Sequence, residues 1–291
     1  MPELAEVEFY RRRWWEAAAR QAVLKAEINP RSRVFRSFAK DFTGDTTALT
    51  KALRNAKLIA SGTHGKQMWF VLKTGKGKSQ YLWLGIHLGM TGHLRVESLG
   101  YRAKKHDAIV LRFAKHILVF NDPRQFGRVR ASFCLPGEPP SWLGHLPAEV
   151  LSLEFTAKFV RGVCARHARA PLKAVLLDQR YFPGIGNWMA DEILWRAALH
   201  PALPAGRAAT PGTVKNLHAA IQQVTRAALR VIAGQGKKLP SDLNVHIPDT
   251  WLFNHRWEKG GVCPKTKKPL SRAEIGGRTT CWSPARQKLP R

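Results

Sequence analysis

Residues 176–187 read Leu-Leu-Asp-Gln-Arg-Tyr-Phe-Pro-Gly-Ile-Gly-Asn, and this stretch decides the fold of the second half of the chain. Its pattern predicts a helix, a turn at Gly184-Ile185-Gly186, and a second helix from Asn187. Two glycines let the backbone approach a ligand, and the next helix offers unpaired N–H groups and the positive end of its dipole. The turn is therefore either a phosphate clamp, with Asn187 donating from its side chain, or an ordinary connection between helices.

The predicted secondary structure differs before and after this stretch. Helical patterns cover residues 149–167, 171–180, 187–199 and 211–233. Strand-like runs come earlier, at Gln67–Leu72, Tyr81–His87, Ala108–Phe113, Ile117–Phe120 and Arg128–Phe133. Their alternation and spacing predict antiparallel hairpins, so the first part is expected to be a β-sandwich or barrel with a helix over residues 3–20.

An α+β fold with four parts follows from this order of elements. We expect an N-terminal β-sandwich domain with its N-terminal helix over residues 1–134 and a Pro-rich linker over 135–148. A helical domain is expected over 149–250. The last part, residues 251–291, contains short β-like pieces around Gly276-Gly277-Arg278-Thr279-Thr280, with 10 basic and 2 acidic residues.

The charge balance restricts the partners of the chain. Its 291 residues include 48 Lys and Arg against 20 Asp and Glu, a formal net charge of +28. Such an excess favours nucleic acid, because each neutralised phosphate releases counterions. A membrane surface is the weaker interpretation, since the basic residues are not gathered on one amphipathic helix, and no apolar run is long enough to span a bilayer.

The amino terminus and the cysteines indicate the compartment. The opening Met-Pro-Glu-Leu-Ala-Glu is acidic and does not match a signal peptide. Four widely spaced cysteines do not form a disulfide framework, which favours a reducing compartment. We expect an intracellular protein, located in the cytoplasm or nucleoid of a bacterium or in the nucleus of a eukaryote.

Pro2 and Glu3 form a candidate catalytic pair. Methionine before proline is commonly removed, which would expose the secondary amine of Pro2 with a reference pKa near 7.7–8. Much of that amine can be neutral at working pH and can attack a sugar C1′ to give an iminium ion, with Glu3 as acid or base. The alternative is a plain helix start, with proline and acidic residues in the first turn.

Motifs along nearly the whole chain, in order, resemble those of the formamidopyrimidine-DNA glycosylase/endonuclease VIII family of DNA repair enzymes. Gly184–Asn187 matches the helix–two-turn–helix motif of the family, and Gly276–Thr280 matches its β-hairpin finger. Six further segments match as well: Met1–Glu8, Gly65-Lys66, His87–Gly92, Lys105–Asp107, Asp122–Gly127 and Leu177–Gln179. Ala5 stands where the family has a proline.

The resemblance implies catalytic roles for three residues. Pro2 would be the nucleophile that forms a Schiff base with C1′, and Glu3 would assist ring opening and base departure. Lys66 would bind phosphate near the lesion and act in the elimination steps, where a cation can stabilise charge on a leaving phosphate. Without the family, Lys66 would be interpreted as a surface lysine.

The resemblance also implies which residues hold DNA. Lys173, Asn187 and Arg278 would contact phosphates, and the planar fork of Arg278 suits bidentate contact. Met90, Arg124 and Phe126 would fill the gap left by the flipped nucleotide; core packing is the alternative for Met90 and Phe126. Glu6 would touch the sugar or base of the lesion.

The finger departs from the zinc-binding pattern of the family. Two Cys-x-x-Cys pairs are replaced by Cys263-Pro-Lys-Thr266 and Ser283-Pro-Ala-Arg286. His255, Cys263 and Cys281 would make an irregular ligand set, so we expect no zinc and no other cofactor. We expect apolar residues to replace the metal, namely Trp251, Phe253, Trp257, Val262, Leu270, Ile275 and Trp282.

The function expected from the resemblance is a bifunctional DNA glycosylase and apurinic/apyrimidinic (AP) lyase of base-excision repair. It would act as a monomer on double-stranded DNA with an oxidised base or AP site, by a proline Schiff base and β,δ-elimination. The short segment between Ala233 and Trp251 favours oxidised pyrimidines, with oxidised purines such as 8-oxoguanine and formamidopyrimidine also possible. The alternative is a non-catalytic or weakly catalytic nucleic-acid-binding protein on the same scaffold; a structural polyanion-binding protein explains the charge but not the motifs.

Overall fold

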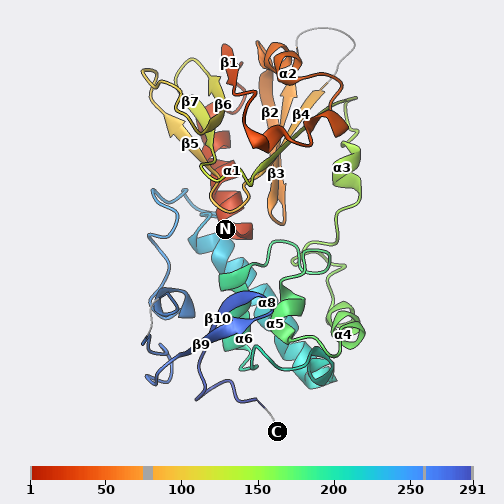
Figure 1. Cartoon of the computed structure of the whole chain (residues 1–291), viewed down its shortest axis with the longest axis vertical. Coiled ribbons are helices and arrows are strands. Elements are labelled where there is room, and N and C mark those ends of the chain that lie inside the picture. The colour runs from red at the N-terminus through yellow and green to blue at the C-terminus, as the bar shows by residue number, and fades with distance from the viewer. Residues whose placement is uncertain (1, 75–80, 258–259, 290–291) are drawn as a thin grey trace. The chain divides into compact units, whose positions relative to one another are not determined.

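The computed structural model describes residues 2–74, 81–257 and 260–289, which form two compact units. The first unit contains Pro2 and Glu6–Leu146, and the second contains Glu3–Ala5 and the residues from Pro147 onward. The elements are mixed helices and antiparallel strands, which confirms the α+β class (Figure 1). Met1, with its predicted removal, and the last two residues of the basic tail lie outside the described residues.

Two four-stranded antiparallel sheets make up the first unit. One has the order β1-β6-β7-β5, with β1 (Lys25–Ile28), β6 (Asp107–Arg112), β7 (Ile117–Asn121) and β5 (His93–Glu97). The other has the order β2-β3-β4-β8, with β2 (Lys57–His64), β3 (Gln67–Lys73), β4 (Tyr81–His87) and β8 (Arg128–Cys134). The predicted β-sandwich with an N-terminal helix is therefore confirmed.

One apolar core joins both sheets to helix α1 (Leu4–Ala18). Alternate residues of each strand enter this core, for example Phe70 of β3 and Phe120 of β7, both almost fully buried. Trp14 of α1 packs on Phe70 with ring centroids 5.2 Å apart, and its indole N–H donates to the Arg95 carbonyl at 3.0 Å. Burial of such large aromatic side chains supplies much of the stability of the unit.

Short helices complete the first unit. They are η1 (Arg33–Phe35), η2 (Phe38–Lys40), α2 (Thr46–Leu53) and α3 (Ser141–Gly144). Helix α3 lies inside the segment predicted as a linker, and its Trp142 is buried. The Trp142 indole N–H donates to Ser132 Oγ of β8 at 3.0 Å, which holds α3 against that sheet.

Helices dominate the second unit: α4 (Ala157–Arg166), α5 (Leu172–Leu176), α6 (Asn187–Arg196), α7 (Ala205–Ala208) and α8 (Pro211–Val231). Helix α4 begins later than predicted, because the Thr156 side chain accepts from the Phe159 N–H and caps the helix there. Helix α6 is buried around most of its circumference and packs on α8 (Figure 1). The predicted helical domain is confirmed.

A two-stranded hairpin, β9 (Ser271–Ile275) and β10 (Arg278–Trp282), follows the short helix η3 (Leu252–His255). Gly276 and Gly277 form its turn with φ of 63° and 71°, a conformation that favours glycine. The predicted finger is therefore present. Its apolar support differs from the prediction, because Trp257 and Val262 are exposed, whereas Trp251 and Phe253 are buried.

Among the described residues, no helix combines the length and the apolar character needed to cross a bilayer.

Candidate functional site

Glu3 is buried and is held by the amino-terminal end of helix α6. Its carboxylate accepts hydrogen bonds from the N–H groups of Gly186 at 2.9 Å, Trp188 at 2.9 Å and Met189 at 3.1 Å. The Leu4 N–H donates to the Gly184 carbonyl at 3.1 Å. The residue that follows Pro2 is thus fixed by the turn predicted from residues 176–187.

The glycines of this turn are required by the approach of Glu3 and Leu4. A Cβ on Gly186 would lie 2.3 Å from Glu3 Cδ, and one on Gly184 would lie 2.6 Å from Leu4 Cβ. The contact of Asn187 with phosphate stays a prediction, whereas the backbone N–H groups of the turn have a partner inside the chain. The N–H groups at the helix end bind the Glu3 carboxylate, an internal anion that satisfies the helix dipole.

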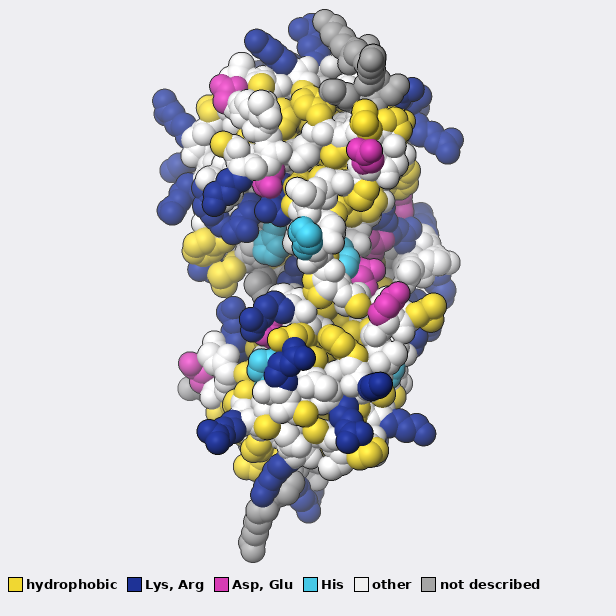
Figure 2. Space-filling model, turned by 90° about the vertical axis from the view of Figure 1, so that its right-hand side faces the viewer, with side chains coloured by type: hydrophobic (Ala, Val, Ile, Leu, Met, Phe, Trp, Pro, Cys, Tyr) yellow, Lys and Arg dark blue, Asp and Glu magenta, His cyan; other side chains and the backbone are white. Residues whose placement is uncertain are grey.

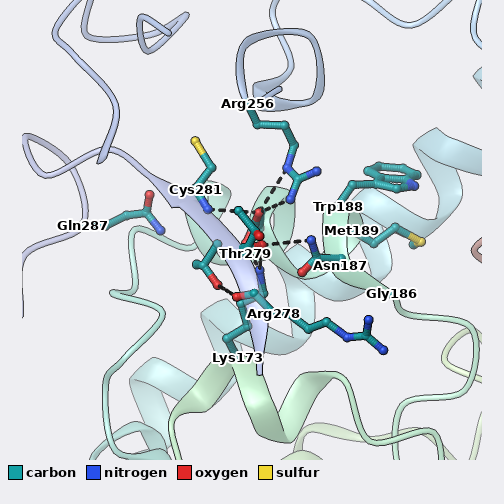
Figure 3. A network of polar contacts seen from close by, with 12 residues as sticks. Lys173, Gly186, Asn187, Trp188, Met189, Arg256, Arg278, Thr279, Cys281 and Gln287 are labelled. Atoms are coloured by element: carbon teal, nitrogen blue, oxygen red, sulfur yellow. Dashed lines mark hydrogen bonds and ion pairs between the residues drawn. The ribbon is translucent and has the colours of Figure 1, made fainter. Parts of the chain in front are cut away.

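Asn187 and Arg278 lie on adjoining elements of the second unit. The Asn187 Nδ2 donates to the carbonyl of Thr279 at 2.9 Å, which joins the start of α6 to β10 beside Arg278. Arg278 is exposed, and its side chain extends away from the surrounding hydrogen bonds (Figure 3). A Cβ on Gly276 would lie 2.8 Å from Ala174 Cβ, so the hairpin turn packs closely on α5.

Asp191 is the centre of a buried polar network that the sequence analysis did not find. Its carboxylate accepts from Lys173 Nζ at 2.5 Å, from Arg256 Nη2 at 2.6 Å and Nε at 3.1 Å, and from the Cys281 N–H at 3.2 Å. One side chain of α6 therefore fastens α5, the end of η3 and β10. The sequence signal for this network is a pair of adjacent acidic residues, Asp191 and Glu192, within a largely apolar helical segment.

Lys173 does not lie where a direct phosphate contact would need it. Its side chain is fully buried and ion-paired with Asp191, and burial lowers its pKa, although Asp191 opposes that shift. The buried ammonium of Lys173 donates hydrogen bonds to Asp191 and to the carbonyl of Thr279. These bonds hold β10 in place. The predicted contact of Lys173 with phosphate is therefore replaced by a structural role.

In the first unit, Lys66 lies in the two-residue turn between β2 and β3 and is mostly buried. Gln67, which follows Lys66 in sequence, is paired with His87 in the register of β3 and β4. The Nδ1 of His87 accepts from the Gly89 N–H at 3.1 Å, which requires an unprotonated nitrogen. Burial, with the positive charges of Lys66, Arg128 and Arg36, lowers the pKa of His87 to about 4.

The turn that carries Met90 packs on the loop that carries Phe126. A Cβ on Gly89, where φ is +64°, would lie 2.5 Å from the backbone of Phe126 and Gly127. Buried Asp122 joins both segments, since it accepts from Thr91 Oγ1 at 2.9 Å and from the Gly127 N–H at 2.7 Å. Two of the predicted wedge residues are thus brought together by contacts that the motifs alone did not reveal.

Phe126 and Arg124 are both exposed, and the guanidinium of Arg124 lies 4.9 Å from the centroid of the Phe126 ring. Gln125 between them has φ of 54° and is held by the Arg33 N–H and by Arg36. The alternative that Phe126 is a core residue is wrong, since 47% of its surface is exposed. Met90 is half-buried.

The two remaining predicted residues, Pro2 and Glu6, belong to the first unit. Pro2 is half-buried and precedes α1, and Glu6 is buried in the first turn of that helix. Glu3 belongs to the second unit.

The family's zinc site does not fit the residues of this finger. Cys263 Sγ accepts from the Trp195 indole and from the Thr266 N–H, both at 3.4 Å, and it packs with Cys281 against Trp195 and Leu252. His255 contacts the Asp249 carbonyl at 2.6 Å instead. The described residues contain no group of three or more potential metal-ligating side chains.

Hydrogen bonds to the end of α6 hold this segment of the finger. Arg286, in the position of the fourth ligand, donates to the carbonyls of Trp195 at 2.7 Å and Arg196 at 2.8 Å. Gln287 donates to the Leu199 carbonyl at 2.9 Å. Arg286 thereby satisfies the Arg196 carbonyl at the end of α6 and adds a donor to the Trp195 carbonyl, which also accepts from the Ala198 N–H at 3.2 Å.

Cys263 and Cys281 differ in their environments. Burial raises the pKa of Cys281 to about 11. Burial also acts to raise the pKa of Cys263, but hydrogen bonds from Thr266, Ser283 and Trp195 outweigh it and lower the pKa to about 7.

Basic side chains are distributed over both units. Figure 2 shows one face of the molecule, on which many Lys and Arg side chains and few Asp and Glu side chains reach the surface. This distribution agrees with the net charge of +28. A surface of this kind attracts polyanions over much of its area.

Comparison with known proteins gives matches over almost the whole chain. Residues 1–129 match the family model described as the formamidopyrimidine-DNA glycosylase N-terminal domain, and residues 146–238 match its H2TH domain. A formamidopyrimidine-DNA glycosylase of Thermus thermophilus is 34% identical, over 99% of this chain and 98% of the relative. One of Kineococcus radiotolerans is 32% identical, over 100% and 99%.

Solved structures with the same fold are also similar. MutM in complex with DNA that contains carbocyclic 8-oxo-G has a TM-score of 0.77 at 24% identity, covering 99% of this chain and all of that one. The Lactococcus lactis Fpg in complex with DNA that contains an abasic site has a TM-score of 0.78 at 24% identity, covering 98% and 99%. At this identity the likeness establishes the fold alone.

Proposed function

The chain belongs to the formamidopyrimidine-DNA glycosylase family, and from this premise we propose that it excises oxidised bases from duplex DNA and then cuts the strand as an AP lyase. Membership of the family makes it a DNA glycosylase of base-excision repair. The lyase step, the individual residue roles and the preferred lesion are the finer parts of the proposal.

The observation that carries this proposal is the attachment of Glu3. Chain termini usually fray unless contacts hold them, yet three N–H groups bind this carboxylate, which is buried. The neighbouring Pro2 is thereby anchored to an ordered residue. A protein that only binds nucleic acid has no need of an amino terminus ordered in this way.

The proposed chemistry begins with removal of Met1, which exposes the Pro2 amine. The amine nitrogen attacks C1′, the glycosidic bond breaks, and the base leaves with a proton. The attacking amine loses its proton, and the bond between C1′ and the ring oxygen then breaks as that oxygen takes a proton, which gives the iminium ion. The iminium ion permits β-elimination at the C3′–O bond and δ-elimination at the C5′–O bond, and water then releases the sugar fragment from Pro2. Glu3 would exchange a proton with the sugar ring oxygen, and Lys66 would stabilise the leaving phosphates.

DNA binding is assigned to exposed groups of each unit. Asn187 and Arg278 would hold phosphates next to the flipped nucleotide, while Phe126 and Arg124, with Met90, would enter the duplex. The exposure of Arg278, Arg124 and Phe126, and the stacking of Arg124 on the Phe126 ring, support these roles. We propose that the protein binds duplex DNA as a monomer, and that its finger works without zinc.

Two indications about the lesion differ. The relatives are named for formamidopyrimidine, a damaged purine, whereas the short segment between Ala233 and Trp251 favours oxidised pyrimidines. We therefore propose oxidised bases as the substrate class. Duplexes that contain formamidopyrimidine, 8-oxoguanine or thymine glycol, compared at equal concentration, rank the lesions.

Borohydride trapping tests the proposal. The mature protein is mixed with an AP-site duplex and reduced, and a covalent protein–DNA adduct is expected. The adduct should disappear in Pro2→Gly and in protein that retains Met1, but persist in the control Pro30→Gly, which replaces an exposed proline of a turn. Full adduct formation by Pro2→Gly would refute the nucleophile, and no adduct with any lesion would favour the binding-only alternative.

A further inference from the structure

A cavity of about 350 Å³ opens on the sheet β2-β3-β4-β8 of the first unit, on the face opposite the core. Its size lies in the range of small-molecule pockets. The described residues that line it include no acidic side chain. The residues that form it include Gln67, Gly85, His87, Phe126, Arg128 and Arg130.

Strand register explains why these residues share one face. Arg128 is opposite His87, and Arg130 is opposite Gly85, in the pairing of β4 with β8. Alternate residues of a strand point to the same side and lie about 6.8 Å apart. The two arginines therefore form a row along the edge of the cavity.

Tryptophan side chains cover the sheet next to this row. A Cβ on Gly85 would lie 2.8 Å from the Trp142 ring, so the missing side chain lets that ring rest on the strand. Trp69 and Trp83 pack nearby with centroids 5.0 Å apart and ring planes inclined by 46°, on the same face as Gly85. Aromatic rings beside arginines are the usual surface for unstacked nucleobases.

The charges of the cavity are available to an anion. The exposed Arg128 guanidinium makes no hydrogen bond or ion pair within the described part of the chain. Arg130 donates Nε to Asp41 at 2.8 Å, the one carboxylate that neutralises the row. The low pKa of His87 reflects, after burial, the positive field of Lys66, Arg128 and Arg36.

We propose that this cavity binds one unstacked deoxynucleotide of the DNA, with its phosphate on Arg128 and its base against the exposed Phe126 ring. The inference rests on the proposed function, since it needs DNA opened by the wedge residues. The ligand chemistry is the same whether the nucleotide comes from the damaged strand or from the opposite strand. Arg128 thereby becomes a DNA-binding residue separate from those assigned to the lesion phosphates.

Fluorescence of 2-aminopurine, which increases when the base unstacks, tests the cavity. The DNA is a duplex with an uncleavable abasic analogue, and the probe base is placed opposite the analogue in one arm and next to it on the damaged strand in the other. The variants are Arg128→Ser and Arg128→Lys. The control, Arg54→Ser, removes the same charge from an exposed residue at the end of α2.

At saturating wild-type protein, fluorescence should rise in one arm, which identifies the strand. Arg128→Ser should abolish that rise and weaken binding about tenfold, as expected for loss of a charged hydrogen bond. Arg128→Lys should restore part of it, and Arg54→Ser should match wild type. Equal 2-aminopurine fluorescence with Arg128→Ser and Arg54→Ser in both arms would overturn the proposal. Borohydride trapping by the wild-type chain tests the proposed function separately.

Discussion

At the scale of single residues, Gly186 and Glu3 depend on each other. The Gly186 backbone has φ of −123°, which any residue adopts, so only the space taken by Glu3 requires glycine there. The sequence interpretation connected this glycine with an external phosphate. The structure connects it with a carboxylate at the start of the chain.

Replacement of Gly186 by alanine is expected to lower the free energy of unfolding by about 2 kcal/mol or more, because Glu3 must withdraw from buried N–H groups. Gly212→Ala is the matched control. Gly212 lies in the first turn of α8 with nothing within 4 Å of an added Cβ, so alanine should be neutral or slightly stabilising. Urea denaturation measures both, and equal midpoints would contradict the assignment.

His87 predicts a pH dependence of stability. Its pKa in the folded protein, about 4, lies below its ordinary value of 6.5, because of burial and the charges of Lys66, Arg128 and Arg36. The unfolded chain therefore binds the extra proton between these values. Neutral His87 makes its full contribution to the free energy of unfolding above pH 6.5. As the pH falls toward 4, this free energy decreases by about 3 kcal/mol.

The measurement compares unfolding free energies of wild type and His87→Gln between pH 4 and pH 7. The difference between the two curves should change over this interval. Parallel curves would show that His87 titrates alike in both states.

At the scale of elements, Asp191 holds the finger to the helical domain. Asp191→Asn would leave Lys173 and Arg256 buried without an anionic partner, a loss of about 3–5 kcal/mol. Binding to AP-site DNA should also weaken, because β10 carries Arg278. The control is Glu274→Gln on the exposed side of β9, and an unchanged urea midpoint for Asp191→Asn would disprove this role.

The finger also predicts independence from metal. We expect a chelator to leave the melting temperature unchanged and elemental analysis to find no stoichiometric zinc. Arg286→Met should in contrast cost about 2 kcal/mol, since two helix-end carbonyls lose a donor. Lys288→Met, at an exposed residue, is its control, and a chelator-induced fall in melting temperature would contradict the prediction.

At the scale of the whole molecule, the net charge of +28 predicts strong and salt-dependent binding of undamaged DNA. With about 6–10 phosphate contacts, affinity should fall roughly 10³- to 10⁵-fold between 50 and 200 mM salt. Fluorescence anisotropy of a labelled duplex measures the slope. A slope near zero would show that the basic surface does not contact the backbone.

The sequence predicted five strands of the two sheets and missed three. Strand β4 was found with its observed bounds, whereas β1, β2 and β5 were missed. Strand β1 has only four residues, and β2 contains Ser61, Gly62 and Thr63, so neither shows a periodic pattern. These strands exist because a neighbour supplies hydrogen bonds, and that information is not local.

For the candidate site, the sequence predicted individual residues but not the side chains to which they are hydrogen-bonded or ion-paired. Phe126 was named as a wedge candidate and is exposed, while the Asp122 carboxylate that holds its loop was not assigned a role. Lys173 was named as a phosphate ligand because it matches a lysine of the family. Its burial against Asp191, 18 positions away, is visible only in the structure.

The sequence by itself determined the family, the α+β class, the basic charge balance and the residue types available for chemistry, because motifs, periodicity and charge are local properties. Only the tertiary structure decided that Glu3, and no external phosphate, takes the N–H groups beside residue 186. It also decided that an Asp191 network and Arg286 hold the finger. Hydrogen-bond partners and burial depend on segments that are distant along the chain and come into contact only when the chain folds.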